Sequence, residues 1–328
     1  VSIIIPNYNH AQFLEERLRS VFQQTYQDFE VILLDDCSTD ASLEILNKYK
    51  THPKVSHFEI NKQNSGSVFK QWVKGVKLAK GKYIWIAESD DVADLEFLER
   101  MVNFAVQKED VGLVFCKSII IDEDGNNTGK TFSLENNNTN FKIKGRDLVS
   151  EYLINQMVIA NASGVLFSKS AFKEIDYDKL VQFKNTGDRY TYIQIGLKRS
   201  ICYIDEPLNF YRGHNSNTTK KNIANYAIYR DRLNIINEMI LECSKSAKAS
   251  KNLLEFYIKQ LFALLKANSF KKNQSLLFKL YKHSYLDFNA LLNFSFLNLI
   301  TLFLSNSVPY SIRKKYKKYI LSEFGIQI

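Results

Sequence analysis

The chain has 328 residues, of which 45% are hydrophobic and 24% charged, a composition typical of a folded globular protein. It contains four Pro and 12 Gly and no segment that repeats at a fixed period, which argues against disordered linkers and solenoid repeats. The net charge of +9 is uneven, because residues 220–328 carry +12 and residues 1–219 carry −3. The basic third predicts either an anionic partner surface or a lysine-rich solubilising surface.

The first 116 residues alternate short apolar runs with amphipathic stretches, a pattern that predicts alternating strands and helices. Strands are expected at 1–5, 29–34, 55–60, 83–87 and 111–116, and helices at 11–24, 41–50, 66–80 and 94–107. The strands are almost continuously apolar, which is typical of a mostly parallel sheet covered by helices on both faces. We therefore predict an α/β fold with a Rossmann-like central sheet.

The second half of the chain is less regular. Residues 122–145 are polar and rich in turn formers, which predicts a hairpin and a mobile loop. Strands are expected at 161–167 and 201–204, with a helix around 188–198. From about residue 222 apolar residues recur every three or four positions, as in helices. Two regions are therefore predicted, an α/β domain at 1–219 and a basic helical region at 220–328.

The C-terminal region contains an uncharged run, Phe288–Ile312, followed by the basic run Arg313–Tyr319. Three asparagines interrupt the apolar run, which argues against a transmembrane helix. Two interpretations stay open: an interfacial helix with a basic anchor, or a helical subdomain whose apolar faces pack together.

The cysteines predict a cytoplasmic location. They stand at positions 37, 116, 202 and 243, too far apart for a CxxC pair, so we expect reduced thiols rather than a zinc site or disulfide framework. The first apolar run is too short for the core of a signal peptide and lacks its basic flank, so secretion by that route is not expected.

Polar segments directly follow three of the predicted strands, at residues 6–9, 35–36 and 88–91. Ligands of open parallel sheets bind at the carboxyl ends of the strands, where these segments would meet. We therefore expect a ligand site at this edge of the sheet.

The third polar segment places Glu88, Asp90 and Asp91 within four positions. Clustered carboxylates repel one another, and a divalent cation removes the repulsion while bridging to phosphate oxygens. Capping of the helix at 94–107 is the alternative, although three carboxylates in four positions favour a metal. In the other two segments, Asp36 could cap the next helix or accept a hydrogen bond from the imide N–H of uracil, and Tyr8 offers a ring on which a base could stack.

The segments VSIIIPNYNHAQFLEERLRSVFQQTYQDFEVILLDDCSTD and NSGSVFKQWVKGVKLAKGKYIWIAESDD resemble family 2 glycosyltransferases, which have the GT-A fold. The resemblance covers residues 1–115 closely and continues more loosely to 219, which would make 1–219 a catalytic domain. It implies an inverting enzyme that moves a sugar from a nucleotide diphosphate sugar, with UDP as the expected nucleotide, to an acceptor hydroxyl. A saccharide or lipid-linked saccharide of bacterial surface polysaccharide or lipopolysaccharide is the expected acceptor, and the basic third suggests peripheral contact with the inner face of the plasma membrane.

The resemblance also implies roles for single residues in the donor site. Asp90 would bind Mn²⁺ or Mg²⁺, and Glu88, where Asp is commoner in the family, would lie near the ribose. The other residues assigned to the donor are Pro6, Tyr8 and Asp36 at the base, and Ser89.

Asp188 matches the position of the family's general base, at the start of a predicted helix. An inverting displacement needs a carboxylate to accept the proton of the acceptor hydroxyl, and a helix-capping role is compatible with that task. Many relatives carry Trp where this chain has Arg189, which leaves the shape of the acceptor pocket open. The run Tyr211–Thr219 resembles an element that closes over the diphosphate, where His214 could complete the metal site and Arg212 could bind phosphate; a polar surface loop is the alternative. The other histidines, at 10, 52, 57 and 283, carry no such signal.

Three other functions are compatible with parts of the sequence. A non-catalytic nucleotide-sugar or membrane-binding module would not need the acidic residues at 36, 88, 90 and 188. A nucleotidyltransferase would need a Gly-rich loop with a basic residue after the first strand, where this chain has NYNHAQ. Nucleic-acid binding is not expected, because the basic residues form neither a known motif nor a single stripe.

Overall fold

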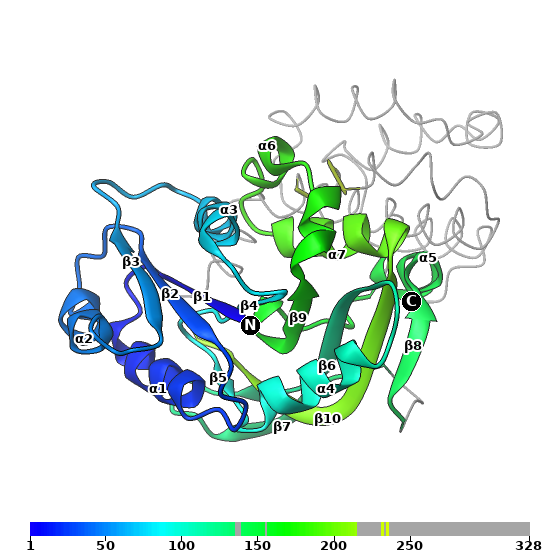
Figure 1. The fold of residues 1–328 in the computed structure, drawn as a ribbon, viewed down its shortest axis with the longest axis horizontal. Coiled ribbons are helices and arrows are strands. Elements are labelled where there is room, and N and C mark those ends of the chain that lie inside the picture. The colour runs from blue at the N-terminus through cyan, green and yellow to red at the C-terminus, as the bar shows by residue number, and fades with distance from the viewer. Residues whose placement is uncertain (135–138, 155, 215–230, 233, 236–328) are drawn as a thin grey trace, which may run out of the picture. The chain divides into compact units, whose positions relative to one another are not determined.

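The structure, a computed structural model, describes residues 1–134, 139–154, 156–214, 231, 232, 234 and 235 (Figure 1). The chain divides into two compact units, Val1–Ile228 and Tyr229–Ile328, and the first of these contains the sheet. The predicted domain boundary at 219/220, the helices from residue 222 and the uncharged run at 288–312 lie outside the described residues. In the part of the chain that the structure describes, no helix is long and apolar enough to cross a membrane.

The first half of the sheet is parallel, as predicted. Its strands are β1 (Ser2–Asn7), β2 (Glu30–Asp35), β3 (Val55–Ile60) and β4 (Tyr83–Ile86), in the spatial order β3-β2-β1-β4. The intervening helices are α1 (Ala11–Phe22), α2 (Ser42–Tyr49) and α3 (Val68–Leu78), and α4 (Phe97–Val106) follows. Each helix lies within three residues of the bounds expected from the sequence.

Beyond β4 the sheet is mixed, and continues in the order β9-β6-β10-β5. The strands are β5 (Val92–Ala93), β6 (Val111–Ile121), β7 (Asn127–Phe132), β8 (Phe141–Lys144), β9 (Val165–Ser168) and β10 (Ser200–Arg212). β9 runs antiparallel to β4 and β6, whereas β6 and β10 are parallel. β6 and β7 form the predicted hairpin. The remaining helical segments are α5 (Gly145–Leu148), a π-helix at Val149–Leu153, 3₁₀ helices at Ala162–Gly164 and Lys169–Glu174, α6 (Tyr177–Leu180) and α7 (Gly187–Lys198).

Two strands are much longer than the sequence predicts. β6 and β10 pair along their whole length, from Ser200 opposite Val111 to Arg212 opposite Ile121. The polar residues in these extensions interrupt the apolar runs from which strands were predicted, and two of them are joined across the strands: Asn209 donates a hydrogen bond to Ser118 at 2.9 Å. The extension of β10 carries Arg212 to the edge where β1, β2 and β4 end.

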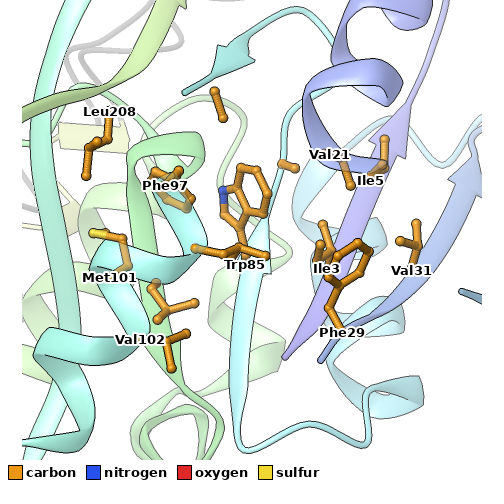
Figure 2. Packing of buried hydrophobic residues seen from close by; sticks show 14 of the residues in the cluster. Ile3, Ile5, Val21, Phe29, Val31, Trp85, Phe97, Met101, Val102 and Leu208 are labelled. Carbon is orange, nitrogen blue, oxygen red and sulfur yellow. The ribbon is translucent and has the colours of Figure 1, made fainter. Parts of the chain in front are cut away.

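Helices cover both faces of the parallel half, with α1 and α4 on one side and α3 on the other (Figure 1). Figure 2 shows Ile3 and Ile5 of β1 packed beside Val21 of α1, with Trp85 of β4 next to them. On the opposite face a glycine permits close packing, since a Cβ on Gly75 of α3 would lie 2.5 Å from the side chain of Ile4. The core therefore fixes the strands and leaves their carboxyl ends free for polar residues. The described cysteines, at 37, 116 and 202, are free thiols.

Candidate active site

The three predicted polar segments meet at one edge of the sheet. β1 and β2 remain paired up to Asn7 and Asp35, whereas β4 leaves β1 after the hydrogen bond from Ala87 N to the Ile4 carbonyl (2.8 Å). Pro6 of β1 has no backbone N–H to donate. It lies beyond the last residue of β1 that pairs with β4, so the sheet loses no hydrogen bond at this position. The chain after β4 therefore turns away from β1 and opens the edge.

Asp36 is 5% exposed and lies at the centre of a set of neutral donors. Its carboxylate accepts hydrogen bonds from the side chains of Asn61 (2.5 Å), Asn64 (3.2 Å) and Gln71 (2.8 Å). Ser65 adds its backbone N–H (3.0 Å) and its hydroxyl (2.7 Å). Because these partners come from residues 61–71, Asp36 orders the segment that leads into α3. The alternative that Asp36 caps α2 is wrong.

The loops after β1 and β2 are tied to each other. Asn7 donates to the Asp35 carboxylate at 2.8 Å, and the side chain of Asn9 accepts from Thr39 N at 2.7 Å. Asn9 has φ of 55°, a left-handed conformation that Asn tolerates better than most residues. Tyr8 lies between these two anchored asparagines with 44% of its surface exposed. Its ring is thus held at the surface of the edge where a base was predicted to stack.

Asp91 faces the protein interior and holds the acidic turn of residues 88–91 in place. It is 1% exposed and accepts hydrogen bonds from Ser163 Oγ (2.6 Å), Arg212 N (2.9 Å) and the Asn161 side chain. Since β5 intervenes before α4 begins at Phe97, neither Asp90 nor Asp91 caps that helix, and the capping alternative is wrong.

Arg17 of α1 places a buried guanidinium beneath the acidic turn. Its Nε donates to the Glu88 carbonyl at 2.8 Å, and its Nη2 donates to Ser163 Oγ at 3.1 Å and lies 3.9 Å from the Asp91 carboxylate. The side chain is fully buried and also lies over the ring of Trp85. A cation in this position offsets part of the repulsion among the carboxylates above it.

Asp90 is the carboxylate that points into the site. His214 Nε2 lies 2.9 Å from its Oδ2, which brings together the two residues predicted to bind a metal. The ring of His10 stands edge-on to that of His214, with centroids 5.7 Å apart. Ligand atoms of His10, Asp90 and His214 all lie within 4.8 Å of one another, so these three side chains could hold one divalent ion. Burial alone would raise the pKa of Asp90, but the hydrogen bond with His214 and the charges of both histidines lower it overall.

Sequence reasoning missed His10. The signal that would have found it is its position, since it directly follows the first polar segment and so reaches the same edge as residues 88–91. Its Nδ1 lies 2.8 Å from Ser89 Oγ, so Ser89, which is 1% exposed, orients the His10 ring.

Arg212 is buried, and its donors are engaged by protein acceptors. Its Nε donates to the Asp90 carbonyl (2.9 Å), its Nη1 donates to the Glu123 carbonyl (3.0 Å), and its Nη2 pairs with the Glu16 carboxylate (2.5 Å). Its guanidinium also lies 5.0 Å from the centroid of the Phe13 ring. Arg212 therefore holds the backbone of the acidic turn against α1 and the β6–β7 hairpin, and its contact with a diphosphate stays a prediction.

Glu88 is held by α3, because Trp72 Nε1 donates to its carboxylate at 2.8 Å. Burial and the neighbouring charge of Asp90 raise the pKa of Glu88 to about 8, and the charges of Asp91 and Asp188 act in the same direction. In the metal-free protein Glu88 is therefore protonated at neutral pH, so it could donate a hydrogen bond as well as accept one.

Asp188 lies in the first turn of α7, partly exposed, near the acidic turn. A Cβ on the preceding Gly187 would lie 2.8 Å from the ring of Phe69, so α7 begins in close contact with α3. Phe69 lies one helical turn before Trp72, the partner of Glu88, and the charge of Asp188 raises the pKa of Glu88. The structure thus brings the predicted base toward the predicted donor residues.

Arg189 stands where the resemblance implies Trp. Its side chain is turned away from the place predicted for the acceptor. The residue is 3% exposed, and its guanidinium donates to the carbonyls of Leu153 and Ile154, at the end of the π-helix. It therefore braces α7 against the preceding segment instead of presenting a charge to an acceptor.

The chain is similar to known proteins in sequence and in fold. The family described as glycosyl transferase family 2 matches residues 2–175. Glycosyltransferase GlyG of Streptococcus pneumoniae is 26% identical over 248 residues, which is 74% of this chain and 80% of GlyG. A putative teichuronic acid biosynthesis glycosyltransferase, TuaG of Bacillus subtilis, is 32% identical over 108 residues, or 33% of this chain. The chain spans 42% of TuaG and about a fifth of the poly(ribitol-phosphate) glycosyltransferases that it matches.

Solved structures share the fold. Staphylococcus aureus TarS in complex with UDP-GlcNAc superposes with a TM-score of 0.62 at 20% identity, covering 82% of this chain and 74% of the TarS chain. The mannosyltransferase PcManGT of Pyrobaculum calidifontis, in complex with GDP-Man and Mn²⁺, has a TM-score of 0.52 at 15% identity, covering 92% of this chain and 84% of PcManGT. At these identities the likeness supports the GT-A fold.

Proposed function

The chain belongs to glycosyl transferase family 2, and from that premise we propose that it transfers a sugar from a nucleoside diphosphate sugar to an acceptor hydroxyl with inversion at the anomeric carbon. UDP is the proposed nucleotide, and the UDP-GlcNAc complex of TarS supports this choice. The names of TuaG and of the poly(ribitol-phosphate) enzymes support a saccharide or lipid-linked acceptor in bacterial surface polymer assembly.

The observation that carries the proposal is the meeting of Asp36, Asp90 and Asp188 around one edge of the sheet. Each belongs to a different part of the chain, and the proposal assigns each to a different task. The backbone N–H of Asp36 donates to the carbonyl of Asn7, the residue before Tyr8 (2.9 Å), Asp90 points toward His10 and His214, and the charge of Asp188 contributes to the raised pKa of Glu88.

Asp188 acts as the general base in the proposed reaction. The acceptor oxygen forms a bond to the anomeric carbon while the bond from that carbon to the diphosphate oxygen breaks, and the diphosphate leaves with the electron pair. Asp188 takes the proton from the acceptor hydroxyl. One displacement at one face of the sugar inverts the configuration, so an α-linked donor gives a β-linked product.

Asp90 and His214 are the proposed metal ligands. A carboxylate oxygen and an imidazole nitrogen are both donors that bind Mn²⁺, and a carboxylate with coordinated waters suits Mg²⁺. Either ion, when bound, would offset negative charge on the leaving diphosphate. Arg212 would contribute by fixing the Asp90 backbone, through its 2.9 Å hydrogen bond to the Asp90 carbonyl.

Asp36 and Tyr8 would hold the base. A carboxylate has about four acceptor positions, and protein donors already fill those of Asp36. An imide N–H of uracil must therefore displace one donor, and the Asn64 amide, whose contact at 3.2 Å is the longest, is the one expected to leave. Nucleotide binding is then coupled to a movement of residues 61–65.

The test is a panel of nucleotide sugars assayed with Mn²⁺ and with chelator, on wild type, Asp90→Ala and Asp188→Asn. One donor should release its nucleoside diphosphate, and chelator or Asp90→Ala should abolish the release. Asp188→Asn should slow transfer by about 10²–10⁴-fold and leave donor binding intact. Asp178→Ala, on the exposed surface of α6, is the matched control. The absence of turnover and of metal-dependent nucleotide binding would contradict the proposal and favour a non-catalytic module.

The role proposed for residues 220–328 rests on their charge of +12. We propose that this region gives peripheral contact with an anionic membrane surface. The full chain should sediment with anionic vesicles at low salt and be released at high salt, and equal sedimentation with neutral vesicles would contradict the electrostatic basis.

A further inference from the structure

We propose that His10 is a third protein ligand of the divalent cation, together with Asp90 and His214, and that this donor set favours transition-metal ions over Mg²⁺. The inference rests on the proposed metal role of Asp90. It adds a residue from the loop after β1, the loop that also carries Tyr8, to a site otherwise built from the acidic turn and the end of β10.

The geometry is close to that of a coordinated ion. The ligand atoms of the three side chains all lie within 4.8 Å of one another. Nitrogen and oxygen ligands bind transition ions at about 2.0–2.2 Å, so two ligands of one ion are at most about 4.4 Å apart. Modest rotation of the imidazole rings is enough to close the remaining gap, because the second side-chain torsion of His is broad.

Ser89 holds the ring of His10 near the orientation that a ligand needs. Metal-binding histidines use one ring nitrogen for the ion and the other for a hydrogen bond that fixes the ring. The Nδ1 of His10 lies 2.8 Å from Ser89 Oγ, and Ser89 is 1% exposed and precedes Asp90 directly. Because Nδ1 contacts Ser89, Nε2 of His10 is the proposed coordinating atom, and Ser89 is the residue that positions the ring.

The backbone around His10 is also fixed. Its carbonyl accepts hydrogen bonds from Phe13 N (2.9 Å) and Leu14 N (3.0 Å), at the start of α1. The preceding Asn9 is anchored through its backbone N–H to Ser38 Oγ at 3.0 Å. The His10 side chain therefore reaches the site from a rigid element, as the ligands of a preformed metal site do.

The donor set predicts which ions bind. Two imidazoles and one carboxylate suit first-row transition ions, whereas Mg²⁺ prefers oxygen ligands and water. Affinity should therefore rise from Mg²⁺ to Mn²⁺ to Co²⁺. A His10→Asp substitution replaces a nitrogen by an oxygen ligand and should move the preference toward Mg²⁺.

The experiment measures cation binding by the full chain after its metal has been removed. Calorimetry is used with Mn²⁺, Co²⁺ and Mg²⁺, and the electron paramagnetic resonance signal of free Mn²⁺ gives a second measure of Mn²⁺ binding. Both are done with and without UDP. His10→Ala should weaken Mn²⁺ binding at least about tenfold, Asp90→Ala should abolish it, and His10→Asp should lower the Mn²⁺/Mg²⁺ affinity ratio by a similar factor. His57→Ala, a histidine on β3 away from the site, should bind as wild type does. Circular dichroism of each variant separates loss of a ligand from loss of folding.

The outcomes distinguish this inference from the proposed function. Unchanged Mn²⁺ affinity in His10→Ala and an unchanged ion preference in His10→Asp, with binding abolished in Asp90→Ala, would overturn the role of His10 and leave the proposed function standing. No cation binding by wild type, with or without UDP, would overturn both. Loss of UDP binding without metal in His10→Ala would identify His10 as a direct diphosphate contact and overturn the ligand assignment.

Discussion

Asp36 and Asp91 lie at the same edge of the sheet, are 5% and 1% exposed, and both accept hydrogen bonds from neutral donors, but Asp91 also lies 3.9 Å from the Arg17 guanidinium and beside other carboxylates. Asp36 accepts hydrogen bonds from neutral amides, a hydroxyl and a backbone N–H. Asp91 lies next to Asp90 and near Glu88, above the guanidinium of Arg17. Burial and the charge of Asp90 raise the pKa of Asp91 to about 6 in spite of that cation.

Under the proposed function, these two sides of the edge would bind the two ends of a nucleotide sugar. The base end needs directional hydrogen bonds to a neutral ring, and a carboxylate surrounded by neutral donors supplies them without attracting ions. The diphosphate end would need a cation, and Asp90 and Asp91, adjacent in the acidic turn, present negative charge that a divalent ion would offset. The following substitutions test whether the two sides are as different as their contacts imply.

The largest effect is expected from Arg17→Met. This substitution removes the cation beneath the acidic turn, so the buried carboxylates there lose a compensating positive charge. The free energy of unfolding should fall by about 3–5 kcal/mol, measured by urea denaturation. Arg19→Met is the matched control on the same helix, since 67% of the Arg19 side chain is exposed, and should cost under about 0.5 kcal/mol. Adding Asp91→Asn to Arg17→Met should recover part of the loss. Equal effects of the two single variants would contradict the role given to Arg17.

A smaller effect is expected from Asp36→Asn, because the new amide nitrogen would face donors from Asn61, Ser65 and Gln71. The free energy of unfolding should fall by about 1–3 kcal/mol, and the affinity for UDP should also fall. The loss of stability should be the same at 50 mM and at 500 mM salt, because the partners of Asp36 are neutral. A strong salt dependence would show that charge, rather than hydrogen bonding, stabilises this side.

The third effect concerns pH, and its size depends on the pH interval over which it is measured. In chelator, Glu88 and Asp91 hold protons in the folded state up to about pH 8 and about pH 6, whereas the unfolded chain releases them above about pH 4. The unfolded state then binds fewer protons, so stability from these groups falls as pH rises from about 4 to 8. One proton corresponds to a slope of about 1.4 kcal/mol per pH unit. Urea titrations of Glu88→Gln should lack the slope between pH 6 and 8, and a slope equal to wild type would refute the assignment.

Much of the site follows from local sequence. Strand β3 has the bounds that its apolar pattern predicts, and β1, β2 and β4 end within two residues of theirs. Since the polar segments directly follow these strands, their meeting at one edge was predictable from the parallel order alone. The assignments of Asp36, Asp90 and Asp188 to base, metal and proton transfer are still predictions.

Other features could not be read from the sequence because they depend on contacts between distant residues. His10 gains a partner through Ser89, 79 positions away, and Arg212 reaches the acidic turn because β10 pairs with β6 far beyond its apolar run. Arg17 shares the buried face of α1 with Leu14 and Leu18, where the helical pattern expects an apolar side chain.

The sequence by itself determined the strands, the helices and the edge at which they present polar residues, because those features depend on the period and composition of short segments. The tertiary structure alone decided which polar side chains are satisfied by the protein and which face the site. Burial of Asp91 and Arg17 is tolerated only when each reaches a partner from another element. The same packing turns Asp90 toward His10 and His214, and so distinguishes the predicted metal ligand from the carboxylate beside it.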